Sequence, residues 1–177
     1  MRPAIPDSAR QLHGRRAEQV ILFTIGRQMF AIAADSVREI RSTDTLAGAA
    51  NELESSEVEK VRHTIERGRR TYYVVNGCAH FRLRVVRPTL AMIFREFRVV
   101  VLVDGIDRMA EIPAVYPLPR AFCGEERAWY RGLAYLEDHV IPVIHPGGFL
   151  TRDEFDRLDR ASSAAASLRE MQGVVQA

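Results

Sequence analysis

The sequence predicts a mainly β fold, in which two small antiparallel barrels share an interface and a C-terminal helix follows. Short segments rich in β-branched and aromatic residues alternate with turn residues along most of the chain. The pattern also repeats with a gapless offset of 69 residues, which indicates an internal duplication. The matched positions are Asp35 and Asp104, Arg62 and Arg131, and Val74 and Val143. Barrels suit such short strands because closing a sheet removes its exposed edges.

The first half of the chain contains two predicted hairpins joined by an extended segment. Gly26-Arg27-Gln28 and Glu66-Arg67-Gly68-Arg69 supply the turns. Residues 46–56 are polar and alanine-rich, which favours a loop or a short helix, and Pro88 closes this half. The predicted extended segments, in order, are Val20–Ile25, Met29–Ala34, Val37–Ile40, Val61–Ile65 and Thr71–Val75.

The second half repeats this arrangement, with strands predicted at Leu90–Phe94, Val99–Val103, Tyr130–Leu136 and His139–Ile144. Pro113, Pro117 and Pro119 mark a long loop between its hairpins. Asp104 ends the most apolar strand, where a carboxylate can be catalytic, a metal ligand or a turn residue. Its counterpart Asp35 favours a structural turn, in which Gly105 tolerates positive φ.

A C-terminal helix is predicted from about residue 152 to residue 171. Thr151 and Glu154 have the spacing of a capping box. An apolar stripe at near-helical spacing should lie on a barrel, although serines at 162, 163 and 167 weaken the far end of the helix. The stripe consists of Phe155, Leu158, Ala165, Leu168 and Met171.

The composition indicates a globular protein of a reducing compartment. The net charge of +2 and the pI of about 8.7 are mild for a nucleic-acid-binding domain, for which a pI above about 9 is typical. Cys78 and Cys123 form no C-x-x-C motif, so a reduced cytosol is the default expectation. The first residues lack the apolar segment of a signal peptide, and no apolar run reaches the roughly 20 residues that span a bilayer.

Candidate catalytic and metal-binding groups are few. In a strand, Cys78 and His80 would share a face and could form a nucleophile or metal pair, but the sequence favours the alternative of a small buried cysteine and a loop histidine. His139 with His145, and Glu125 with Glu126, are better explained as surface groups. No nucleotide-binding glycine motif is present. We therefore expect no enzyme activity, no cofactor and no metal site.

Two further features leave alternatives open. The basic cluster Arg67–Arg70 beside Tyr72 and Tyr73 is a candidate site for single-stranded nucleic acid on a small barrel, although neighbouring glutamates dilute its charge. Trp129 and Tyr130 are either core residues or an exposed anchor for a protein partner.

Several segments together resemble the CheW-like chemotaxis coupling proteins. The resemblance covers the order of strands and turns from Val20 to Asp159. The segments that carry it are VREIR (Val37–Arg41), RVVVLVDGI (Arg98–Ile106), YRGLAYLEDHVIPVI (Tyr130–Ile144) and FLTRDEFDRLD (Phe149–Asp159).

The resemblance implies two intertwined five-stranded SH3-like barrels without enzyme activity. Family members are cytoplasmic adaptors that couple the cytoplasmic tip of methyl-accepting chemoreceptors to the regulatory domain of a CheA-type histidine kinase. The receptor lies in the groove between the barrels, and the kinase domain packs largely on the second barrel. No nucleic acid and no membrane insertion are expected. The predicted organisation is a flexible tail at 1–18, a CheW-like domain at 19–160 with barrels at about 20–87 and 88–150, a helix at 151–172 and a tail at 173–177.

The resemblance also assigns candidate receptor-groove residues. Arg67 and Gly68 match the end of the family's N-L-R-G turn, and Val37, Glu39 and Ile40 match its V-x-E-I strand. The family's P-V-x-D-L segment appears here as Tyr73–Gly77 without its proline and aspartate, and residues 42–62 resemble the family little. The second barrel is the better preserved half.

Overall fold

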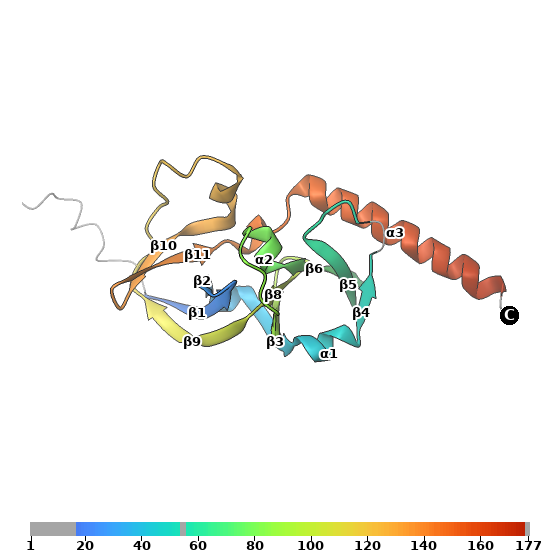
Figure 1. The fold of residues 1–177 in the computed structure, drawn as a ribbon, viewed down its shortest axis with the longest axis horizontal. Coiled ribbons are helices and arrows are strands. Elements are labelled where there is room, and N and C mark those ends of the chain that lie inside the picture. The colour runs from blue at the N-terminus through green and yellow to red at the C-terminus, as the bar shows by residue number, and fades with distance from the viewer. Residues whose placement is uncertain (1–16, 54–55, 176–177) are drawn as a thin grey trace, which may run out of the picture.

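The computed structural model describes residues 17–53 and 56–175, which form two mixed β-sheets and a long C-terminal helix (Figure 1). The strands are β1 (Glu18–Ile25), β2 (Gln28–Ala33), β3 (Val37–Ser42), β4 (Ala50–Glu52), β5 (Val61–Arg67), β6 (Arg70–Asn76), β7 (Leu90–Phe94), β8 (Val99–Val103), β9 (Gly105–Ile112), β10 (Tyr130–Leu136) and β11 (His139–Ile144). The helices are η2 (Ala34–Ser36), α1 (Thr43–Ala47), α2 (Gly77–His80), η3 (Glu125–Trp129), η4 (Pro146–Gly148) and α3 (Arg152–Val175).

The two sheets confirm the mainly β class and the C-terminal helix but are not two closed five-stranded barrels. One sheet has the order β10-β11-β2-β1-β9, and the other has the order β3-β7-β8-β6-β5-β4. No ladder joins the end strands of either sheet within the described residues. A single bridge, with N–O distances of 2.8 Å in both directions, links Tyr116 after β9 to Leu133 in β10. The second sheet has six strands because β4, which the sequence did not predict, pairs with β5.

Each sheet combines strands from both halves of the chain. The hairpin β1–β2 lies in the sheet of β9, β10 and β11, and the hairpin β7–β8 lies in the sheet of β3 to β6. The halves at about 20–87 and 88–150 therefore describe the repeat in the sequence, and not the sheets. The two copies have exchanged their first hairpins.

The 69-residue offset holds in the details of the pairing. It carries β5 onto β10, together with the β-bulge that each strand has near its start, at Val61/His63 and at Tyr130/Gly132. The parallel pair Val74–Val100 has its counterpart in Val143–Ala31. The same offset carries β3 onto β9, a strand that the sequence did not predict.

The core has three parts, because alternate residues of each strand face opposite sides. One face of each sheet has its own cluster. The cluster of the first sheet includes Val20 and Ala31, and that of the second includes Ile65 and Tyr72. The largest cluster lies between the sheets and contains Phe23, Phe30, Tyr73 and Phe94 among others. Apolar contact thus fuses the two units.

Asp104 joins the sheets and has the structural role that the duplication suggested. Its backbone N–H donates to the carbonyl of Thr24 at 2.8 Å, and its carboxylate accepts a hydrogen bond from the backbone N–H of Arg27 at 2.9 Å. The expected tight turn is wrong, since the chain runs through Asp104 directly into β9 and Gly105 has no positive φ. The carboxylate holds a distant turn in place.

The capping box at the start of α3 is formed as predicted. Thr151 N–H donates to the Glu154 carboxylate at 2.8 Å, and Glu154 N–H donates to Thr151 Oγ1 at 3.2 Å. Leu158 is buried and Phe155 packs against the central core. The helix continues to Val175, four residues beyond the predicted end, and leaves the body of the molecule (Figure 1). Ser163 and Ser167 donate to carbonyl groups four residues earlier, so their hydroxyls are accommodated in the helix.

The predicted tails are mostly beyond the described part of the chain. Residues 1–16 lie outside it, and so do residues 176 and 177, whereas 173–175 belong to α3. Among the described helices, none combines the length and the hydrophobicity that a membrane span requires.

Candidate functional site

The first candidate site is the β3 surface, which we define as Glu39, Arg41 and Arg67. An Nη2–Oε2 ion pair of 2.7 Å joins Arg67, at the end of β5, to Glu39 in β3. Arg41 donates to the other carboxylate oxygen. These hydrogen bonds, from Arg41 first and Arg67 second, lower the pKa of Glu39 below its ordinary value. The structure thus brings together two residues that the sequence assigned to one groove from separate segments.

The other predicted groove residues have different surroundings. Val37 is buried in the central core and packs β3 against it, whereas Ile40 is exposed. Gly68 has φ of 62°, which explains the glycine through the turn conformation. Nothing lies within 4 Å of the position that a Cβ would take there. The Nη1 atom of Arg67 is buried and has no hydrogen-bond partner within the described residues.

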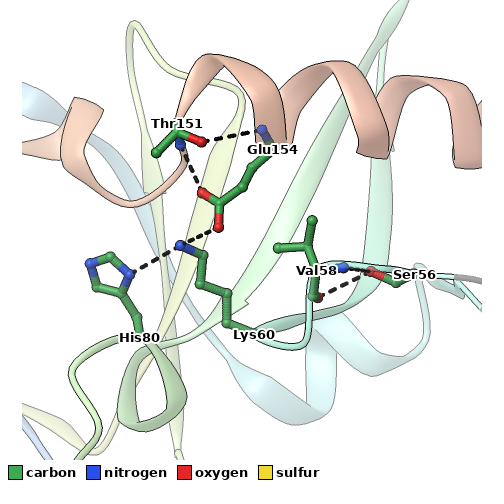
Figure 2. Close-up of polar contacts among 6 residues, drawn as sticks. All are labelled: Ser56, Val58, Lys60, His80, Thr151 and Glu154. Carbon is green, nitrogen blue, oxygen red and sulfur yellow. Dashed lines mark hydrogen bonds and ion pairs between the residues drawn. The ribbon is translucent and has the colours of Figure 1, made fainter. Parts of the chain in front are cut away.

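A second polar cluster lies at the junction between the sheets and α3 (Figure 2). Lys60 Nζ is 2.8 Å from Glu154 Oε1 and 3.5 Å from His80 Nδ1. The same Glu154 carboxylate accepts the capping hydrogen bond from Thr151. The only lysine of the chain therefore ties the first turn of α3 to α2 and to the segment before β5.

His80 is held in its neutral form. Its side chain is packed against the rings of Phe81, Trp129 and Phe149, with centroid distances of 4.6, 4.6 and 4.8 Å. Burial, with the charge of Lys60 as a smaller cause, lowers the pKa of His80 to about 3. No local pattern in the sequence predicts this cluster, although the 69-residue offset makes Lys60 the counterpart of Trp129 and His80 the counterpart of Phe149.

The alternative of a Cys78–His80 pair on one face of a strand is wrong, whereas the favoured prediction of a small buried cysteine is confirmed. His80 is buried in a helical turn and does not lie in a loop. Gly77–His80 is a helical turn, because Asn76 caps it by accepting a hydrogen bond from Ala79 N–H at 3.1 Å. Residues two apart in a helix do not face each other. Cys78 belongs to the central core, and His80 Nδ1 faces Lys60. No hydrogen bond joins the thiol to the imidazole in the described part of the chain, so the pair is not a nucleophile–base site.

The remaining candidates do not assemble into a catalytic or metal site. The described residues contain no group of three histidine, cysteine, aspartate or glutamate side chains that could hold a metal ion. His139 and His145 are exposed, as is Glu125. Tyr72 and Tyr73 beside the basic cluster are buried, so they offer no surface on which bases could stack. Trp129 is half-buried against His80 and Phe81, which is mainly a packing role.

Comparison with known proteins gives one informative result. No protein-family model and no curated protein sequence matches the chain. Among solved structures, it is similar to the scaffolding protein TtCheW from Thermoanaerobacter tengcongensis. The TM-score is 0.65, the sequence identity is 13%, and the match covers 80% of this chain and 93% of that chain. The chain has the CheW-like fold. The predicted resemblance is thereby confirmed at the level of the fold.

Proposed function

We propose that this chain is a non-enzymatic adaptor of a chemotaxis-type signalling array, which couples methyl-accepting chemoreceptors to a CheA-type histidine kinase. The observation that carries the proposal is the CheW-like fold, since the similar solved structure is that of a scaffolding protein. The proposed role requires a cytoplasmic location, at membrane-associated receptor arrays.

The β3 surface supports the receptor side of the proposal. Arg67 is held by one carboxylate, and its buried Nη1 lacks an acceptor among the described residues. An unsatisfied donor costs free energy, and a carbonyl or carboxylate group of a receptor helix would satisfy it. The exposed Ile40 lies on the opposite face of the same strand, so its apolar contact would be made apart from Arg67.

The mechanism follows from the way the two sheets are joined. The shared core and the exchanged hairpins make one rigid body, in which a receptor on one surface and a kinase on another keep a fixed geometry. A change in the receptor then biases the kinase only if the adaptor contacts the two kinase states differently.

The test is reconstitution with a receptor cytoplasmic fragment and a CheA-type kinase from the same genome. We expect the wild-type chain to bind the kinase regulatory domain and to make kinase autophosphorylation dependent on the receptor. Arg67→Glu should lower receptor affinity at least tenfold and leave kinase affinity within twofold. The charge-swapped double variant Glu39→Arg/Arg67→Glu restores the internal ion pair, so it controls for folding. Absence of binding to both partners would refute the adaptor function.

A further inference from the structure

The outer side of the β10–β11 hairpin is apolar and open. We define the β10–β11 face as Tyr116, Leu133, Tyr135, Val140 and Pro142. Tyr135 and Val140 are directly paired across the strands, and their exposed fractions are 56% and 52%. Tyr116, which is 37% exposed, packs edge-on against Tyr135 with a centroid distance of 5.2 Å. Leu133 pairs with Pro142 and is bridged to Tyr116, so the residues form one continuous patch.

The other copy of the repeat shows what covers such a face. The 69-residue offset relates Leu133, Tyr135, Val140 and Pro142 to Thr64, Glu66, Thr71 and Tyr73. Glu66 and Thr71 are exposed or half-buried and polar, and they hydrogen-bond to each other at 2.8 Å. Thr64 and Tyr73 are buried. The Tyr73 ring meets Phe155 of α3 at a centroid distance of 6.0 Å, and its hydroxyl donates to Asp159 of the same helix.

In the β5–β6 hairpin, the helix α3 therefore covers the apolar Tyr73, and the solvent-facing positions carry the polar residues Glu66 and Thr71. The β10–β11 hairpin has apolar residues at both kinds of position, and α3 runs along the opposite half of the molecule (Figure 1). No described helix buries Tyr135 or Val140. Because large exposed apolar patches on soluble proteins usually mark interaction sites, this face needs an occupant.

We propose that the β10–β11 face binds an amphipathic helix of a partner protein, in the way that the β5–β6 hairpin binds α3. Such a helix would present apolar residues at i, i+3 and i+4 to the tyrosines. This inference does not depend on the adaptor function, since the face lies on the sheet that does not contain the β3 surface.

The charges around the hairpin tip select the kind of helix. Arg108 is shared between Asp107 at 3.0 Å and Glu137 at 2.8 Å, whereas the Asp138 carboxylate has no hydrogen bond or ion pair among the described residues. The hairpin tip and the adjoining part of β9 thus carry three carboxylates, two of which pair with one guanidinium group. The partner helix should carry a lysine or arginine over the tip, because the excess charge there is negative.

A second copy of α3 fits this face poorly. On its own hairpin α3 uses Asp159 against Arg98, with distances of 2.9 and 2.8 Å. The position that corresponds to Arg98 in the other copy is Met29, which offers no cation. The Asp159 carboxylate of a second copy would therefore lack its cation at the equivalent position on this face.

The test uses three synthetic 18-residue helical peptides and the full chain. One peptide has a leucine stripe at i, i+3, i+4 and i+7 with lysines at one end, the second has glutamates instead of the lysines, and the third has the first composition in scrambled order. Fluorescence anisotropy should show saturable binding of the lysine peptide, at least tenfold weaker binding of the glutamate peptide and none of the scrambled one.

Variants then locate the binding. Tyr135→Ser should lower the affinity for the lysine peptide at least tenfold, and Asp138→Asn should lower it about twofold to fivefold. The matched control Glu66→Ser on the other hairpin, and Arg67→Glu, should leave this affinity unchanged. Equal binding by Tyr135→Ser, or no saturable binding, would overturn the proposal. Concentration-dependent dimerisation that Tyr135→Ser abolishes would also overturn it, in favour of a second copy as occupant. The effect of Arg67→Glu on receptor coupling tests the adaptor function, and peptide binding by the β10–β11 face is independent of that result.

Discussion

The two copies of the repeat keep the same geometry with different chemistry. In the first copy the positions at the junction are Lys60 and His80, and in the second they are Trp129 and Phe149. His80 packs on both Trp129 and Phe149, and Lys60 contacts His80. Duplicated units in one chain can thus replace a symmetric contact by an asymmetric one. One copy then supplies the polar connection to α3 and the other supplies the aromatic surface.

The two copies also differ at their β-bulges, where equivalent positions have different steric requirements. In β10 the bulge contains Gly132, and a Cβ added there would lie 2.2 Å from the carbonyl oxygen of Tyr116. The equivalent residue in β5 is the exposed His63. The second copy therefore needs a glycine because the long loop after β9 passes close to the strand.

Gly132→Ala should give the largest loss of stability, because either the loop or the strand must move. We expect the free energy of unfolding in urea to fall by about 2–3 kcal/mol. His63→Ala, at the equivalent place, should change it by less than about 0.5 kcal/mol. Equal effects of the two substitutions would mean that the loop does not limit the second copy.

His80→Phe gives the first copy the aromatic residue of the second and should alter the response to acid. The pKa of His80 is about 3 in the folded chain and near 6.5 in the unfolded chain, so the unfolded state takes up the proton first. Wild-type stability should fall below pH 6.5 by up to about 1.4 kcal/mol per pH unit from this residue, and remain unaffected by it above pH 6.5.

Thermal unfolding between pH 7.5 and pH 4.5 would measure this difference. The variant should lose less stability than the wild type on acidification, whereas His139→Phe at an exposed position should follow the wild type. An unchanged acid response of His80→Phe would show that the imidazole is not kept neutral by its surroundings.

Asp159→Asn should have the smallest effect and concerns the helix that only one hairpin carries. The Asp159 carboxylate accepts two hydrogen bonds from the Arg98 guanidinium. The guanidinium also lies over the rings of Tyr73 and Phe155 as a cation–π contact. We expect a loss of about 1 kcal/mol, at the low end for charged hydrogen bonds, because both side chains are more than a third exposed.

The pH dependence of this contact has a defined sign. Hydrogen bonding from Arg98 lowers the pKa of Asp159, so the stabilisation is present above about pH 4 and is lost as the pH falls through the folded pKa. Hydrogen exchange of the first turns of α3 should be faster in the variant than in the wild type. Asp156→Asn, an exposed change on the same helix, should leave the exchange unaltered.

Much of the fold could be predicted because its hairpins are local. Apolar runs bounded by residues such as Gly26, Gly68 and Asp138 specify each hairpin within a few positions. The exchange of hairpins could not be predicted, since the pairing of β2 with β11 joins residues over a hundred positions apart. Strand β9 was missed because Asp107, Arg108 and Met109 are successive exposed residues, which hides the alternation of a half-buried strand.

The contacts of the candidate site could not be predicted from the sequence, because they join segments that are distant along the chain. Glu39 and Arg67 came from the family resemblance, and their ion pair needed the structure. The ion pair of Lys60 with Glu154 joins the approach to β5 with the last helix, and no local pattern in the sequence marks it. The helical turn at Cys78 was missed because four residues capped by Asn76 are too few to show a period.

The exchanged hairpins determine the order in which the chain can fold. During synthesis β1 and β2 appear first, but their sheet partners β9, β10 and β11 appear last, so that sheet stays incomplete until Ile144 has been made. Such distant pairing slows folding and leaves strand edges open in the meantime. It also means that neither half can complete a sheet alone. Two fragments cut in the connection between α2 and β7 should therefore regain the fold only when mixed.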